Sequence, residues 1–410
     1  TGLDVNEARV EAINRGESYL QDMDRERIAA LHADGRLAAS TDYDTLVSAD
    51  CIFICVPTPY NKQRAPDLSF IIAAAEGIAA RLRRGQLIVL QSTTYPGTTE
   101  EEVLPILERS GLQAGPDFHL AFSPERVNPG DRLHTLHNTP KVVGGIDELS
   151  ARLTAQLLAR LAPDVHIVSS PRAAEMTKLL ENVFRSVNIA LVNELALLSE
   201  RMGIDIWEVI AAAASKPFGY MPFTPGPGVG GHCIPVDPYY LTWKAREYDF
   251  YTKFVELAAE VNQDMPYHVV DLIAAALSRR GKALRGADVL LLGVTFKRDV
   301  DDARNSPAER IVELLAAAGA QVAYHDPYVP LFHVGANHVL DRPLDLQRET
   351  LTEARLAACD CLAIVAAHSS YDYPWLVRHA PLIVDTVNAT GDLAGPHIVR
   401  LGAPFPSGTP

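Results

Sequence analysis

The sequence has no stretch approaching the roughly 20 consecutive apolar residues that a membrane-spanning helix requires. It also shows no amino-terminal segment with a basic start and a small-residue cleavage site. Positive charge is scarce, because 37 Lys and Arg residues face 51 Asp and Glu residues, for a formal net charge of −14. A nucleic-acid partner is not expected, since neutralising phosphates needs a basic face. We therefore expect a cytoplasmic protein with neither a membrane nor a nucleic-acid partner.

Cysteine is also rare, with five residues in 410. Four of them lie in apolar runs that resemble strands, where we expect buried, unreactive thiols: Cys51, Cys55, Cys359 and Cys361. An odd number without a secretory signal favours reduced thiols over a disulfide framework. Cys233 differs, because glycine and proline surround it. No metal site is predicted.

The chain is long enough for two or three domains. Its first part alternates helical stretches with short β-branched runs, which we interpret as buried parallel strands at Cys51–Pro57, Leu87–Thr93, His119–Pro124 and Val165–Ser169. One helix is expected over Asp67–Arg84. The same alternation restarts near residue 286, with a helix over Pro307–Ala318. This pattern predicts two doubly wound, Rossmann-like α/β domains, at residues 1–168 and 271–410.

A helical region, residues 169–270, is expected between these domains. Ser170 and Pro171 form a typical helix start, and Gly203 a typical stop. Apolar residues occupy nearly all sides of this long helix, so we expect it to be buried and to contribute to a dimer interface. A second helix is expected over Tyr251–Gln263.

The chain begins with what resembles the end of a second strand, an acidic residue and a helix. In a dinucleotide fold, an acid about 20 residues after a glycine-rich turn binds the ribose hydroxyls, and Asp4 fits that position. We expect the first strand and its GxGxxG turn upstream of residue 1, and weak NAD binding without them. A GxGxxG match at Gly226, Gly228 and Gly231 is false, because no strand precedes it.

The segment Pro225–Leu241 carries the strongest chemical signal. Its glycines would let a ligand approach Cys233, and Asp237 lies four residues further on. The alternative is a tight structural loop that happens to contain a cysteine. On the long helix, Lys178 and Asn182 are four residues apart and share a face. Burying a polar pair on a helix costs free energy, so such a pair indicates a function in the site. The alternative is a buried lysine that Glu175 or Glu181 neutralises.

Three further loops follow strands, where doubly wound sheets bind ligands: VPTP at 56–59, QSTTYPGTT at 91–99 and SPERVNPGD at 123–131. Each could instead be ordinary turn chemistry. Four motifs together resemble the UDP-glucose/UDP-N-acetylhexosamine 6-dehydrogenase family along essentially the whole chain: SPERVNPGD, ExTKLLENxFRxxxxxxxNE, GGHCIPVDPYYL and TFKRDVDDARNSP.

That resemblance implies an enzyme that oxidises a primary alcohol of a UDP-sugar twice with NAD, for surface polysaccharide precursors. Cys233 would be the nucleophile, through a thiohemiacetal and a thioester. The other implied catalytic residues stabilise oxygen charge (Lys178, Asn182), handle protons or water (Asp237, Glu125) or hold a water (Thr93). Implied cofactor contacts are Asp4, Arg9, Thr58, Ser92 and Arg304, and implied substrate contacts are Lys297, Gly230, Gly231 and Arg126.

Three features depart from the family pattern. The glycine-rich turn is absent, and Val387 replaces an arginine that commonly grips the nucleotide. HCIPVDP and SPERVNPG differ from the SCFPKD and NPEF forms usual in UDP-glucose enzymes and resemble the branch acting on UDP-N-acetylglucosamine or its epimers. UDP-glucose stays an alternative substrate. A β-hydroxyacid dehydrogenase fits less well, because it needs no cysteine, and an inactive binding protein is the third hypothesis.

Overall fold

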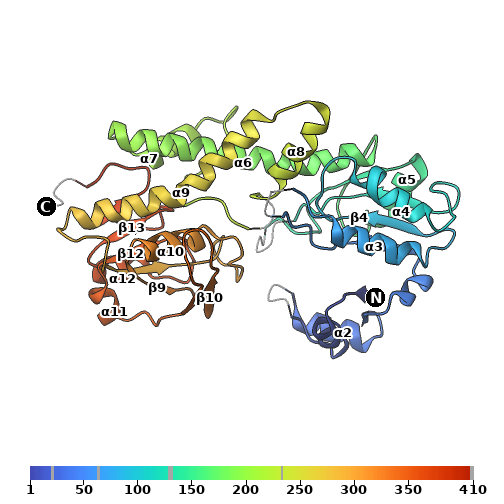
Figure 1. The fold of residues 1–410 in the computed structure, drawn as a ribbon, viewed down its shortest axis with the longest axis horizontal. Helices are drawn as coiled ribbons and strands as arrows, with labels where there is room; N and C mark the ends of the chain where they lie inside the picture. The colour runs from blue at the N-terminus through green and yellow to red at the C-terminus, as the bar shows by residue number, and fades with distance from the viewer. Residues whose placement is uncertain (20–22, 62–64, 128–132, 232–233, 407–410) are drawn as a thin grey trace. The chain divides into compact units, whose positions relative to one another are not determined.

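The computed structural model describes residues 1–19, 23–61, 65–127, 133–231 and 234–406. The chain divides into two compact units. The first comprises Thr1–Glu181 and Tyr239–Tyr251, and the second comprises Asn182–Pro238 and the chain from Thr252 onward. Each contains a five-stranded sheet (Figure 1). No helix in the described ranges combines the length and apolar character needed to cross a membrane.

The sheet of the first unit has the order β3-β4-β5-β6-β7. Its strands are β3 (Cys51–Ile54), β4 (Leu87–Leu90), β5 (His119–Phe122), β6 (Lys141–Gly145) and β7 (Val165–Val168). All neighbours are parallel except β5 and β6, which are antiparallel. The sequence interpretation missed β6 and its reversed direction. It was also wrong about β7, whose residues are half-buried or exposed because β7 is an edge strand.

Helices cover both faces of this sheet. Leu120 and Phe122 of β5 pack with α3 (Ser69–Ala79) and α4 (Leu104–Glu108), and a short π-helix, η2 (Thr99–Val103), leads into α4. Ala121, between them, packs with α5 (Glu148–Leu158) on the opposite face. This alternation follows from the two-residue repeat of a strand, and it explains why β4 and β5 are apolar at nearly every position.

The segment before β3 forms a separate small element. β1 (Gly2–Leu3) and β2 (Ala39–Ser40) pair in parallel, outside the five-stranded sheet. The helices α1 (Glu7–Asn14), α2 (Arg25–Ala33) and η1 (Tyr43–Ser48) accompany them. Asp4 directly follows β1, as expected for a residue after a strand.

The second unit confirms the expected second doubly wound domain. Its parallel sheet has the order β14-β13-β12-β8-β9, with strands β14 (Ile398–Arg400), β13 (Ile383–Asp385), β12 (Cys361–Ile364), β8 (Asp288–Leu292) and β9 (Gln321–His325). Two helices, α9 (Lys253–Ser278) and α10 (Pro307–Ala317), cover one face, and α11 (Glu353–Ala358) and α12 (Tyr373–His379) cover the other (Figure 1). The hairpin β10 (Leu331–Val334) and β11 (Leu344–Gln347) completes the unit.

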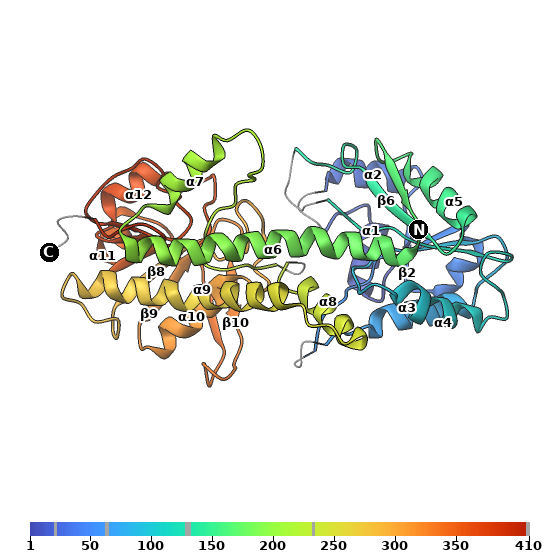
Figure 2. The same cartoon turned by 90° about the horizontal axis from the view of Figure 1, so that it is seen from above.

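The predicted long helix is α6 (Pro171–Met202), drawn as one uninterrupted helix in Figure 2. The Ser170 hydroxyl accepts the Ala173 amide, and Gly203 has a φ of +71°, so both predicted ends are confirmed. The expectation that the helix is buried all round is wrong for the single chain. Large apolar side chains along one face are exposed, from Phe184 (46%) to Met202 (61%). Apolar residues on every side do not reveal which side lacks a partner within the chain.

Two shorter helices complete the central region. α7 (Ile206–Ala214) follows α6, and α8 (Asp237–Ala245) with the 3-10 turn η3 (Arg246–Tyr248) precedes α9. The Asn193 side chain on α6 donates to Asn262 on α9 over 2.9 Å, and both residues are buried. α9 extends well beyond the predicted Gln263, through Ser278.

Candidate active site

Glu125 lies in the turn after β5, at the carboxyl end of the parallel strands. Its Oε1 accepts the main-chain amides of Arg126 and Val127, both at 2.8 Å. Lys141 at the start of β6 donates to both carboxylate oxygens, at 2.9 and 2.8 Å, and Gln91 donates to Oε2 at 2.9 Å. Burial alone would raise the pKa of the Glu125 carboxyl group. The hydrogen bonds from Lys141 and from the main chain lower this pKa by more than burial raises it, so the pKa lies below its ordinary value. Glu125 is therefore held as a carboxylate.

Lys178 on α6 points at this turn. Its ammonium group donates to the main-chain oxygen of Glu125 at 2.8 Å. The two carboxylates that could have neutralised it bind elsewhere. Glu175 accepts the amides of Gly97 and Thr99, and Glu181 pairs with Arg126. The alternative that Glu175 or Glu181 simply neutralises Lys178 is therefore not what the structure shows.

Arg126, a predicted substrate contact, directly follows Glu125 in the turn after β5. Its guanidinium donates to the Pro140 carbonyl at 2.7 Å and lies 2.7 Å from a Glu181 carboxylate oxygen. A substrate would have to share or replace these partners, so substrate binding by Arg126 stays a prediction.

The loops after β3 and β4 carry the other predicted residues of the first unit. Ser92 is buried, and its hydroxyl donates to the Val56 carbonyl at 2.7 Å, which joins the two loops. The Thr58 carbonyl accepts the Tyr240 hydroxyl of α8. Thr93 is half-buried, whereas Thr94, which had no predicted role, is buried and bonds to Thr98 at 2.6 Å. The Thr94 hydroxyl thus has a structural hydrogen-bond partner in Thr98. The role of Thr93 stays a prediction.

Asp4 and Arg9 lie together at the start of the first unit. The Arg9 guanidinium lies 3.3 Å from the Asp4 carboxylate, and that carboxylate also accepts the Asn6 amide at 2.9 Å. A carboxylate just beyond a parallel strand fits the vicinal hydroxyls of a ribose, because it can accept from both. The residues present thus fit the ribose end of NAD.

In the second unit, Asn182 and Asp237 meet. Both are buried, at 5% and 1% exposure, and the Asn182 amide donates to Oδ2 of Asp237. Asp237 opens α8, where the amide dipoles of the first turn stabilise a carboxylate. The structure therefore places these two predicted catalytic residues in direct contact.

Gly230 and Gly231 pack against residues 295–306, the loop that carries the predicted substrate contact Lys297 and the predicted cofactor contact Arg304. A side chain at Gly230 would place its first carbon 2.7 Å from Cβ of Phe296 and 2.8 Å from the Asn305 carbonyl. The Asn305 amide donates to the Gly231 carbonyl at 3.2 Å, and Gly231 has a φ of +86°. Only glycine fits both positions. Gly230 and Gly231 are thus adjacent in space to the TFKRDVDDARNSP motif, which their separation in sequence could not show.

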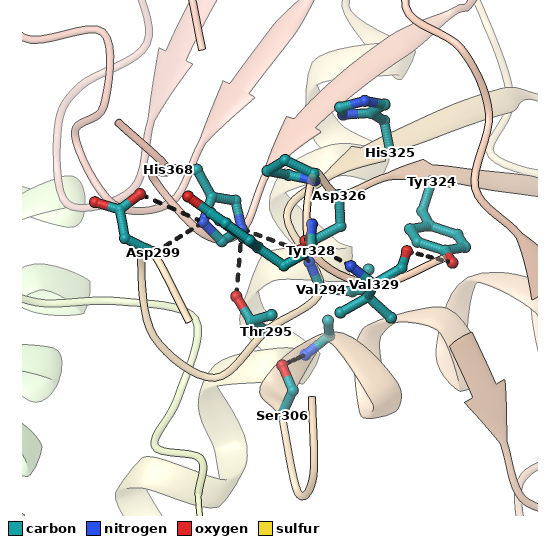
Figure 3. Close-up of polar contacts among 12 residues, drawn as sticks. Val294, Thr295, Asp299, Ser306, Tyr324, His325, Asp326, Tyr328, Val329 and His368 are labelled. Atoms are coloured by element: carbon teal, nitrogen blue, oxygen red, sulfur yellow. Dashed lines mark hydrogen bonds and ion pairs between the residues drawn. The ribbon is translucent and has the colours of Figure 1, made fainter. Parts of the chain in front are cut away.

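A buried network supports the same loop (Figure 3). His368 and Asp326 are fully buried, and Nε2 of His368 lies 3.0 Å from Oδ2 of Asp326. The Asp299 amide donates to Nδ1 of His368 at 2.9 Å, so Nδ1 carries no hydrogen and Nε2–H donates to Asp326. Oδ2 of Asp326 also accepts the Val294 amide at 2.8 Å. These contacts fix both ends of the segment that carries Lys297.

Arg304, the predicted cofactor contact of this loop, is exposed and pairs with Asp302 through Nε at 2.9 Å and Nη2 at 2.7 Å. It borders a hollow of about 580 Å³ lined also by Tyr328 and His333. The Lys297 carbonyl accepts the Thr295 hydroxyl at 2.8 Å. The ligand contacts of Lys297 and Arg304 stay predictions.

Cys233 lies outside the described residues. Among the other four cysteines, Cys359 and Cys361 are buried as predicted, and burial raises the pKa of Cys359 to about 11. The expectation was wrong for Cys55, which is exposed because it follows the end of β3, and Cys51 is only half-buried. The Cys55 thiol donates to Gln91 at 3.4 Å.

Two polar residues that organise the site were missed from sequence. Lys141 begins the run KVVGG, and a lysine that opens a buried apolar run is a signal that could have marked it. Glu175 is fully buried, and it accepts the Thr99 hydroxyl at 2.6 Å as well as two amides of the loop after β4. Burial raises the pKa of Glu175, and the Thr99 and Gly97 hydrogen bonds oppose that rise. Both residues support loops at the same sheet edge.

Known proteins resemble this chain along its length. Three domain profiles of the UDP-glucose/GDP-mannose dehydrogenase family match: the NAD binding domain at residues 1–162, the central domain at 172–264 and the UDP binding domain at 290–392. The UDP-N-acetyl-D-glucosamine 6-dehydrogenase of Pseudomonas aeruginosa is 38% identical over 330 residues, which are 80% of this chain and 77% of that protein. The UDP-N-acetyl-D-mannosamine dehydrogenase of Pyrococcus horikoshii is 35% identical over 342 residues, 83% and 80%.

Solved structures agree with these matches. The UDP-D-ManNAc dehydrogenase of Pyrococcus horikoshii superposes with a TM-score of 0.86 and 30% identity, covering 98% of this chain and 93% of that one. The NDP-N-acetyl-D-galactosaminuronic acid dehydrogenase of Methanosarcina mazei gives 0.78 and 33%, covering 97% and 87%. The chain therefore belongs to the UDP-glucose/GDP-mannose dehydrogenase family, whose members include NAD-dependent UDP-sugar dehydrogenases.

Proposed function

We propose that this protein oxidises the 6-hydroxymethyl group of a UDP-N-acetylhexosamine, UDP-N-acetylglucosamine foremost, to the uronate. The observation that carries this proposal is that these relatives are named for N-acetylated sugars. The resemblance of HCIPVDP and SPERVNPG to the N-acetylhexosamine branch supports the same substrate class. The relative with the highest identity of these three is named for the N-acetylglucosamine substrate.

The proposed chemistry needs one residue to hold the substrate covalently between two oxidations. Cys233 attacks the aldehyde formed in the first oxidation, and the thiohemiacetal becomes a thioester in the second. NAD, when bound, accepts a hydride in each oxidation. Lys178 and Asn182 stabilise negative charge that develops on the substrate oxygen.

Thioester hydrolysis then needs an ordered water. Asp237 is the proposed residue for this step, because it is a buried acid held by Asn182 in the segment that follows Cys233. Thr93 is proposed to hold the water. Water attack on the thioester releases the carboxylate and returns the Cys233 thiol.

A substrate panel tests the assignment. We expect the highest kcat/KM with UDP-N-acetylglucosamine, a value at least about tenfold lower with its manno and galacto epimers, and a lower one again with UDP-glucose. A site that hydrogen-bonds a substrate group rejects analogues that lack it, since its polar atoms are left unpaired. NADH formation and the mass of the product measure this ranking. A higher kcat/KM with UDP-glucose would refute the N-acetylhexosamine assignment.

We also propose that the protein works as a homodimer through the central helices. The exposed apolar side chains of α6 within the second unit recur at helical spacing on one face: Phe184, Leu191, Leu195, Leu198 and Met202. Contiguous exposed apolar surface of this kind is typical of interfaces, and a second copy of the chain presents the same face.

Replacing Leu195 and Leu198 together with glutamate is expected to convert the dimer to a monomer, because it buries two unpaired charges at the interface. Light scattering on a sizing column measures the mass. Leu161→Glu, an exposed apolar position outside α6, is the control and should leave the dimer intact. A wild-type mass of one chain would rule out this proposal.

A further inference from the structure

We propose that His368 is a positioning residue whose two ring nitrogens have different roles. Nδ1 holds the turn over residues 295–299, which carries Lys297, in the shape that binds the nucleotide part of the substrate, and Nε2–H stabilises the buried Asp326. This inference rests on the proposed function, because it takes Lys297 as a contact of the UDP-sugar. All three residues lie within residues 290–392, which match the UDP binding domain of the family.

The imidazole ring of His368 is fixed in place. It is fully buried, and the rings of Tyr328 and Tyr371 pack edge-on against it, with centroids 5.1 and 5.6 Å away. Nδ1 accepts the Asp299 amide at 2.9 Å, so the hydrogen is on Nε2 (Figure 3). The ring thus offers one acceptor and one donor, and the two nitrogens cannot exchange roles while both contacts persist.

The Nδ1 contact fixes the end of the turn. Asp299 has a φ of +58°, a left-handed conformation that residues with a side chain rarely adopt and that the surrounding structure must maintain. The Ser369 amide also donates to Oδ1 of Asp299 at 2.7 Å, but that contact holds a side chain that can rotate. Nδ1 holds the main-chain amide itself, two residues after Lys297. The path of the turn at Lys297 therefore depends on Nδ1.

The Nε2 contact stabilises Asp326. Nε2–H donates to Oδ2 at 3.0 Å, and both side chains are fully buried. Burial alone would raise the pKa of Asp326, but the hydrogen bonds from His368 and from the Val294 and Tyr328 amides lower this pKa by more, so Asp326 is a carboxylate. Removing one donor from a buried carboxylate destabilises the folded state. The Nε2 contact therefore contributes mainly to stability.

The beginning of the turn has anchors that do not involve His368. The Val294 amide donates to Asp326 at 2.8 Å, and the Thr295 hydroxyl donates to the Lys297 carbonyl at 2.8 Å. Nε2 also lies 3.3 Å from the Thr295 hydroxyl oxygen, which is a longer contact. Losing Nε2–H leaves the two shorter contacts in place, whereas losing the Nδ1 acceptor removes the main-chain anchor at Asp299.

Two substitutions separate the two nitrogens in the full chain. The amide group of asparagine is bonded at Cγ, like Nδ1, so His368→Asn keeps an acceptor for Asp299 and loses the donor to Asp326. The amide of glutamine lies one bond further out, so His368→Gln keeps the donor and loses the acceptor. We expect His368→Gln to weaken UDP binding at least about tenfold, the loss of one charge-assisted hydrogen bond, and His368→Asn less than about threefold. Calorimetric titration with UDP measures both.

Thermal unfolding should give the opposite order. We expect His368→Asn to lower Tm by at least about 3 °C, because it leaves the Asp326 carboxylate short of a donor, and His368→Gln to lower Tm less. His397→Gln is the matched control. It removes another histidine contact of the second unit, 2.9 Å from the Val377 carbonyl, and should leave UDP binding unchanged.

A double-mutant cycle tests whether His368 acts through Lys297. Lys297→Ala alone should weaken UDP binding at least about tenfold. Adding His368→Gln to it should weaken binding by less than about twofold more, because the turn then has no lysine to position. Hydrogen–deuterium exchange over residues 295–306 gives a readout independent of binding and activity, and it should rise at least about threefold in His368→Gln and less than about twofold in His368→Asn.

The outcomes decide the proposal. Equal losses of UDP affinity in the two His368 variants, or losses that follow the fall in Tm, would show a general structural role and overturn it. A His368→Gln protein that does not fold would have the same meaning. A further tenfold loss in the Lys297→Ala background would show that His368 does not act through Lys297. If UDP binding follows the expected order but no UDP-sugar is oxidised, the proposed function fails and the role of His368 stands. A wild-type protein that binds no UDP would overturn both.

Discussion

Replacing Cys233 with serine is expected to abolish uronate formation while nucleotide-sugar binding changes little. The second oxidation requires a covalent adduct, and a serine hydroxyl is a far weaker nucleophile than a thiol near neutral pH although it is nearly the same size. Product analysis by mass spectrometry measures uronate, and calorimetric titration with the UDP-sugar measures binding.

Cys51→Ser is the control for this experiment. Cys51 is half-buried at the start of β3, and burial raises the pKa of its thiol to about 11, so it is a poor nucleophile and its replacement should preserve turnover. Full uronate production by Cys233→Ser would remove Cys233 from the mechanism.

Replacing Lys178 with alanine should lower kcat by about two orders of magnitude or more. The loss corresponds to the roughly 3 kcal/mol expected when one preorganised, charge-stabilising donor is removed. Substrate affinity should change less, because the charge that Lys178 stabilises develops only during the reaction. Initial rates over a range of substrate concentrations separate kcat from KM.

Lys253→Ala, at the exposed first residue of α9, is the matched control and should retain wild-type kcat. Thermal unfolding of both variants distinguishes a catalytic from a structural role. A Lys178→Ala protein that unfolds at a much lower temperature yet turns over normally would identify Lys178 as a structural residue.

The sequence predicted most of the fold, because apolar runs bounded by turn residues mark buried strands well. It failed at β6, whose run KVVGG has only three residues with side chains beyond hydrogen. A run of apolar residues bounded by turn residues does not indicate the direction of a strand, so the sequence could not predict the antiparallel pairing of β5 and β6. The exposed face of α6 was missed for a related reason, since periodicity shows that a face is apolar and not what covers it.

The sequence predicted which residues belong to the candidate site. It predicted only some of the contacts between them. Lys178 and Asn182 followed from helical spacing, but no pattern of side chains indicates that the partner of Lys178 is a main-chain carbonyl. Asp237 was expected near Cys233, whereas its contact with Asn182 joins segments 55 residues apart. Such pairings are decided by tertiary packing.

The reversed direction of β6 has a topological consequence. In an all-parallel sheet every strand begins at the edge opposite the ligand-binding loops, so the first residue of a strand cannot reach them. The register of β5 and β6 pairs Ala121 with Gly145 and Phe122 with Gly144, and three further steps bring position 141 opposite position 125. β6 and β7 are both inverted relative to β3, β4 and β5, and β6 thus delivers a cation from its amino end to the edge where β3, β4 and β5 deliver their carboxyl ends.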